Sequence, residues 1–73
     1  MEMTVSPYRI KARYHASQAW VHLGRAREAK LRLRRMTGAW EIMINRGIIR
    51  DQAHFARQSM RCATLYRQIE GRL

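Results

Sequence analysis

The feature that most constrains this chain is its single proline, Pro7, after which apolar residues recur at helical spacing. Proline is tolerated in the first turn of a helix and breaks its interior. Ser6, directly before it, is a favourable N-cap. The apolar stripe that follows ends at Gly24, a residue typical of helix C-termini. We therefore expect a first helix over residues 7–23, with one stripe formed by Tyr8, Ala12, Ala16, Ala19, Trp20 and Leu23.

Residues 25–36 carry a second, narrower apolar stripe, which predicts a second helix. Its members are Ala26, Ala29, Leu33 and Met36. Residues 39–49 fit both strand and helix spacing, and a lone strand would have no partner. We expect a short helix or an apolar linker there, with a turn at Asn45 and Gly47.

The last helix is expected to begin at Asp51, a suitable N-cap, and to run over residues 51–70. The fold class is therefore all-α, a single domain over residues 1–73 with three helices or three plus a short one. Large apolar residues are few, so each is expected to help form the core. The expected core residues are Trp20, Leu23, Leu33, Trp40, Phe55 and Cys62.

The chain is strongly basic, with fifteen Lys and Arg against five Asp and Glu and a formal net charge of +10. All but two of the basic residues are Arg, which suits bidentate contacts with phosphate or carboxylate. A surplus of this size indicates an acidic partner. A chain of 73 residues also has a thin core, which leaves open stabilisation by a homodimer.

The densest basic segment lies in the second predicted helix, opposed only by Glu28. This surplus exceeds what solubility requires, so we interpret it as a binding surface for an acidic protein or a nucleic acid. The residues are Arg25, Arg27, Lys30, Arg32, Arg34 and Arg35.

Catalytic and metal-binding patterns are not found in the sequence, so we expect no enzyme activity and no cofactor. There is no Gly-rich phosphate loop and no carboxylate pair at helical spacing. His15 and His22 are seven residues apart and share roughly one helix face, but no Cys or acidic residue nearby completes a metal site.

A lone cysteine, Cys62, fits a reducing compartment, and we expect a cytoplasmic protein. No apolar run reaches the roughly 18 residues of a membrane span. Residues 1–7 contain Glu2 and no basic cluster, which is unlike a secretory signal.

Most of the chain, about residues 8–57, resembles the ANR family of small negative regulators of AraC-type transcription activators. The matching residues are Ala16, Ala19, Leu23, Gly24, Ala29, Asn45, Arg46, Ala53 and Phe55. The resemblance implies a bacterial or phage transcription regulator. Such a protein would bind an AraC-type activator or a nucleoid protein and would have one uninterrupted last helix.

Residues 40–70 also resemble the helix-turn-helix of serine recombinases, through Arg46–Gly47, Gln52 and the run from Thr64 to Arg67. This second resemblance implies direct DNA binding and a helix break near residues 59–61. The DNA-binding residues would be Arg50, Arg57, Arg61, Thr64 and Arg67. A third option is a phage-type inhibitor of a nuclease or a host defence complex.

Overall fold

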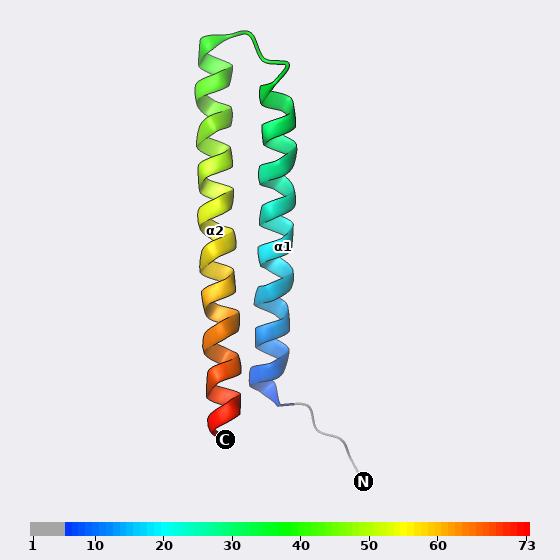
Figure 1. Ribbon diagram of the computed structural model, residues 1–73, viewed down its shortest axis with the longest axis vertical. Coiled ribbons are helices and arrows are strands. Elements are labelled where there is room, and N and C mark those ends of the chain that lie inside the picture. The colour runs from blue at the N-terminus through cyan, green and yellow to red at the C-terminus, as the bar shows by residue number, and fades with distance from the viewer. Residues whose placement is uncertain (1–5) are drawn as a thin grey trace.

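The computed structural model describes residues 6–73 as two long antiparallel helices, with a rod-like outline of 60 × 21 × 12 Å. Helix α1 spans Pro7–Leu33 and helix α2 spans Ala39–Arg72, joined by a short connection (Figure 1). The all-α class is confirmed, but the expected three helices are two. Residues 1–5 of the expected domain, including Glu2, lie outside the described part.

The predicted start of the first helix is confirmed. The Ser6 hydroxyl accepts a hydrogen bond from the Tyr8 amide at 3.3 Å, and Pro7 occupies the first turn. At the other end of the rod, Gly38 is the N-cap of α2 with an extended backbone. The backbone amide of Ile42 donates to the Gly38 carbonyl at 3.0 Å, which begins the α2 ladder.

Three predicted helix boundaries are wrong. Gly24 lies inside α1, and the predicted turn at Asn45 and Gly47 and the predicted N-cap Asp51 all lie inside α2. Each signal is local and weak, because a mid-helix glycine costs only about 1 kcal/mol. Packing of one long helix against the other outweighs that cost.

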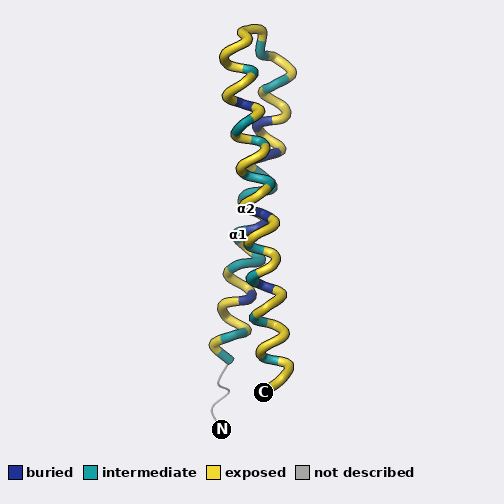
Figure 2. Tube along the Cα trace, turned by 90° about the vertical axis from the view of Figure 1, so that its left-hand side faces the viewer, coloured by how far each residue is buried: buried dark blue, intermediate teal, exposed yellow. Residues whose placement is uncertain are grey.

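The helices meet along a seam with alternating spacings of three and four residues, the repeat of a coiled coil. Every seam position is buried or half-buried, and Figure 2 shows buried positions recurring along both helices. In α1 and its C-terminal extension the seam residues are Tyr8, Ala12, His15, Ala19, His22, Ala26, Ala29, Leu33 and Met36. In α2 they are Ile42, Asn45, Ile49, Gln52, Ala56, Ser59, Ala63, Tyr66 and Glu70.

Small side chains occupy the most deeply buried positions of this seam. Among the described residues, the buried hydrophobic positions are all alanine: Ala12, Ala19, Ala26, Ala29, Ala56 and Ala63. Alanine lets two helix backbones approach closely but removes little apolar area from water. The seam therefore defines a geometry without supplying a large hydrophobic core.

Polar pairs fix the register of the hairpin. His22 Nδ1 lies 2.6 Å from Gln52 Oε1, an acceptor, so this ring nitrogen donates. The buried Asn45 amide donates to the Ala29 carbonyl. Residue numbers in these pairs add to the same value, as they do for the stacked rings of Tyr8 and Tyr66. The three pairs therefore define one continuous antiparallel alignment.

The predicted large-residue core is wrong in part. Trp20 is 66% exposed, Trp40 69% and Phe55 43%, whereas Leu23 and Leu33 are half-buried. Cys62 is also half-buried. Trp20, Trp40 and Phe55 lie off the three-four seam, whereas Leu33 belongs to it.

The two mid-helix glycines give a direct test of this packing. A Cβ added at Gly24 or at Gly47 would meet nothing within 4 Å, and neither residue has a positive φ. We expect Gly24→Ala and Gly47→Ala each to raise the free energy of unfolding by about 1 kcal/mol. Urea denaturation followed by circular dichroism measures this. A loss of stability in both variants would contradict uninterrupted helices at these positions.

Within residues 6–73, neither helix contains a stretch that is long and apolar enough to cross a bilayer.

Candidate polyanion-binding face

The seam divides the remaining surface of the hairpin into two long sides. One side is identified by a shared hollow that Leu23 lines together with Ala53 and Met60. The other is identified by the His22 and Phe55 rings, whose centroids are 5.5 Å apart. The other residues are assigned to one side or the other by helical spacing, because residues three and four apart lie on the same face of a helix.

The side of Leu23 and Met60 collects most of the positive charge, and we call it the basic face. Nine exposed basic residues belong to it. The positions of both helices that flank the seam on this side contain no Asp or Glu among the described residues. The nine basic residues are Arg9, Arg13, Arg27, Lys30, Arg34, Arg46, Arg50, Arg57 and Arg67. The two helices lie side by side and antiparallel (Figure 1), and the spacing of the basic residues relative to the seam places both rows on one side of the rod.

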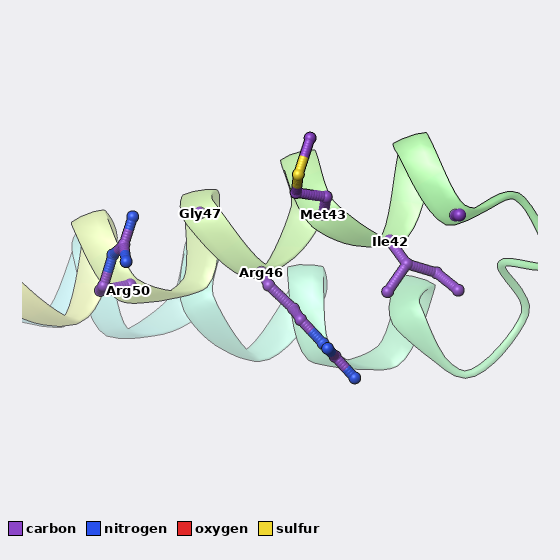
Figure 3. A pocket seen from close by; sticks show the side chains of 6 residues that line it. Ile42, Met43, Arg46, Gly47 and Arg50 are labelled. Carbon is purple, nitrogen blue, oxygen red and sulfur yellow. The ribbon is translucent and has the colours of Figure 1, made fainter.

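A shallow hollow lies on this face near the connection between the helices, with arginines beside an apolar floor. Figure 3 shows Arg46 projecting from α2 on the same side as Ile42, whereas Met43 and Arg50 project the opposite way. Gly47 adds no side chain between them, which keeps the hollow open. Guanidinium groups beside apolar surface suit a ligand with both charge and flat apolar parts.

Among the described residues, one basic residue of this face is paired with a carboxylate. Arg9 Nε lies 3.1 Å from the Glu70 carboxylate, at the end of the rod opposite the connection between the helices. The other ion pair among residues 6–73 joins Arg32 to Glu28 at 3.6 Å on the opposite side of α1. The other eight exposed guanidinium and ammonium groups on the face therefore have no carboxylate partner in the described part: Arg13, Arg27, Lys30, Arg34, Arg46, Arg50, Arg57 and Arg67.

The predicted cluster at residues 25–35 is exposed but does not form one surface. Arg27, Lys30 and Arg34 lie on the basic face, whereas the spacing of the other three places them on the opposite side. Those three are Arg25, Arg32 and Arg35. A run of adjacent basic residues surrounds a helix, so the folded hairpin divides it between two sides.

The residues predicted from the helix-turn-helix resemblance also separate. Arg50, Arg57 and Arg67 lie on the basic face, and Arg61 lies on the outer edge of α2. Thr64 is exposed, and its hydroxyl donates to the Met60 carbonyl of its own helix at 3.0 Å. The expected break at residues 59–61 is wrong, because α2 continues through them.

Sequence reasoning missed Arg9, Arg13 and Arg46 as members of this surface. The sequence of α2 did carry a signal for this row. Its spacing alternates in steps of three and four residues, at positions 46, 50, 53, 57, 60, 64 and 67. Helical spacing shows which residues share a face within one helix, but it does not show how two helices pack. The sequence therefore does not place the two basic rows on one side. The hairpin register provides that link.

Two of the three histidines, His15 and His22, lie in the seam. His15 stacks with Tyr66 at 5.6 Å between centroids, and Lys11 Nζ lies 5.5 Å from the Tyr66 ring. Within the described residues, no group of three His, Cys, Asp or Glu side chains is placed to hold a metal ion.

Comparison of the chain with protein-family models, with curated proteins and with solved structures returned no match.

Proposed function

We propose that this chain is a non-enzymatic regulatory protein that binds the phosphate backbone of a nucleic acid through its basic face. One observation carries the proposal: nine exposed Arg and Lys residues from both helices share one side, where no described acidic residue flanks the seam. Arginine is suited to bidentate phosphate contacts. Rows of this kind position a protein on a duplex without reading bases.

The two residue sets predicted for different functions support one common surface. Three residues of the cluster at 25–35 and four of the helix-turn-helix set, Arg50, Arg57, Thr64 and Arg67, belong to the same face. A continuous α2 favours contact along the backbone over insertion of a recognition helix after a turn. Regulation of transcription, which the ANR resemblance implies, would then follow from occupancy of nucleic acid.

A salt titration with matched charge variants tests the proposal. Arg27→Glu with Arg57→Glu reverses two charges on the basic face. Arg25→Glu with Arg35→Glu makes the same change in net charge on the other side. We expect binding of a DNA duplex by the original protein to weaken steeply with salt, with a log–log slope of about −0.9 per phosphate contact.

The first variant should lose more than tenfold in affinity at 0.1 M salt and show a slope about two units shallower. The matched control should retain most of the affinity and the slope. Fluorescence anisotropy at four salt concentrations measures both quantities. Equal losses in the two variants, or a flat salt response of the original protein, would disprove a defined phosphate-binding face.

A second candidate is an acidic protein partner, as the ANR resemblance implies. The hollow near Arg46 and Arg50 favours it, because its Ile42 and Met43 floor would contact apolar side chains of such a partner. Affinity capture from a bacterial lysate, with and without nuclease, separates the two candidates. Capture that persists after nuclease treatment and is lost in Arg46→Glu would favour the protein partner.

A further inference from the structure

The hairpin leaves much of its apolar surface uncovered. Alanines are the buried hydrophobic residues of the described part, and large apolar side chains such as Leu65, at 57% exposure, remain in contact with water. A domain of this size buries only about 60% of its unfolded surface and is marginally stable without a staple or a partner. Extended exposed apolar surface on a soluble chain marks an interaction site.

The side of the hairpin that carries Phe55, opposite the basic face, concentrates this surface. We call it the apolar face. All of its apolar members other than the half-buried Cys62 are more than a third exposed. They are Tyr14, Val21, Ile44, Ile48, Phe55, Cys62, Leu65 and Ile69.

On α2 this face is a second seam. Its positions from Glu41 to Arg72 alternate in steps of three and four residues, as the first seam does. In order they are Glu41, Ile44, Ile48, Asp51, Phe55, Gln58, Cys62, Leu65, Ile69 and Arg72. A helix with two such stripes is built to pack against two helices, and α1 covers only one of them.

The order of residues along this second seam is nearly self-complementary. When α2 is reversed about its midpoint between positions 55 and 58, Ile44 meets Ile69 and Ile48 meets Leu65, while Glu41 meets Arg72. A two-fold symmetric interface requires this relation, because each patch must fit its own copy. The hairpin register places the midpoint of Tyr14 and Val21 at the same height, so the same axis pairs those two residues.

The apolar face and the basic face also differ in their charge. Three acidic residues, Glu28, Glu41 and Asp51, occupy the apolar face together with five basic ones. On the basic face, by contrast, Arg9 pairs with Glu70 of the seam, and the other eight basic residues have no carboxylate partner in the described part. Contact between two apolar faces therefore brings together much less net positive charge than contact between two basic faces would, and it keeps the strongly basic faces apart. An acidic partner would be drawn to the other side.

We propose that the apolar face binds a second copy of this chain, forming a two-fold symmetric, antiparallel four-helix bundle. Helix α2 packs against α2 of the partner, α1 lies against the partner's α1, and both basic faces point outward. This is the arrangement of up-down bundles with short connections. The inference does not depend on the proposed function, since it concerns the opposite side of the molecule.

Register-specific cross-linking tests this arrangement, with Cys62 as the reporter. In the proposed dimer Asp51 lies opposite Cys62 of the other copy, whereas the two Cys62 residues are displaced by eleven residues, roughly 16 Å. Disulfides require Cα atoms within about 7 Å. We therefore expect Asp51→Cys to give a covalent dimer under mild oxidation. The original chain and Asp51→Cys combined with Cys62→Ser should remain uncross-linked.

Sedimentation equilibrium tests association without any cross-link. The purified full chain should have twice its chain mass of 8.7 kDa at micromolar concentration. Ile48→Gln should raise the dimer Kd by roughly tenfold or more, because the symmetric interface loses two isoleucines. The matched control Ile10→Gln changes the same residue type on the outer edge of α1, where Ile10 is 57% exposed, and should leave Kd unchanged.

Specific outcomes would overturn the proposal. A monomer of 8.7 kDa at 100 µM would exclude a stable dimer. Efficient Cys62–Cys62 linkage in the original chain would show a different alignment, as would equal cross-linking of all three proteins. Circular dichroism of each variant checks that its helices form. The DNA titration described above changes none of these positions, but its control Arg25→Glu with Arg35→Glu lies on the apolar face. Sedimentation of that control shows whether it still associates, so that either proposal can fail alone.

Discussion

Replacing Asn45 by aspartate is expected to unfold the hairpin at neutral pH while leaving it folded in acid. Asn45 is 3% exposed, and its side-chain amide donates to the Ala29 carbonyl. In Asn45→Asp at pH 7 a carboxylate would face that carbonyl oxygen, with no donor between them. A buried charge without a partner costs several kcal/mol, comparable to the whole stability of a small domain.

The pH dependence follows from the protonation of the introduced group. Burial beside a carbonyl raises the pKa of that carboxyl in the folded chain above its unfolded value of about 3.9. Below the unfolded pKa the neutral acid can donate to the Ala29 carbonyl, and the variant approaches the original stability. As pH rises from about 4 through the folded pKa the folded state loses stability, and the full penalty applies above it.

Thermal unfolding at fixed protein concentration between pH 3 and 8 measures this effect, expressed relative to the original chain at each pH. Gln68→Glu provides the matched control, because it makes the same chemical change at an exposed position of the same helix. The control should change stability by less than about 0.5 kcal/mol. A variant Asn45→Asp that matched the control at pH 7 would place Asn45 outside the seam.

Enlarging the alanine seam is expected to have the next largest effect. Ala63 is fully buried, at 0% exposure, where α2 faces α1. Ala63→Leu would force the helices apart or drive the new side chain into a strained rotamer, at a cost of about 2 to 3 kcal/mol. The adjacent exposed Thr64 gives the control, since Thr64→Leu adds a similar volume outside the seam.

Urea denaturation resolves the two variants. Ala63→Leu should lower the midpoint of unfolding, whereas Thr64→Leu should leave it unchanged or raise it slightly, because leucine is the better helix former. Equal midpoints for Ala63→Leu and the original chain would mean that the two helices are not closely packed at this level.

The proposed dimer gives the alanine seam a physical purpose. With alanines between α1 and α2, the large apolar side chains project from the sides of a flat hairpin that is 12 Å in its shortest dimension. Two such slabs bury their large apolar side chains between them, which the isolated hairpin does not do. Stability would then depend on protein concentration. Each outer surface would also carry one basic face, so that a single dimer presents two phosphate-binding surfaces on opposite sides.

The helix-turn-helix resemblance predicted a helix break that the structure does not have. Residues from Thr64 to Arg67 lie in an unbroken helix, with the Thr64 hydroxyl bonded to its own backbone. The resemblance depended on residue types at short spacing, and these are equally compatible with one continuous helix. The ANR resemblance stays a prediction, and its implied uninterrupted last helix is compatible with α2.

The sequence by itself determined the helical class, the start of the first helix at Ser6 and Pro7, and the large positive charge. These properties are local, because capping, helical periodicity and net charge depend on neighbouring residues. Only the tertiary structure decided that Gly24 and Asp51 lie inside helices and that Trp20 is exposed. It alone also placed the basic rows of α1 and α2 on one side. Each of these outcomes depends on which face of one helix meets the other, a choice made by the small residues that pack closest and not by the largest apolar ones.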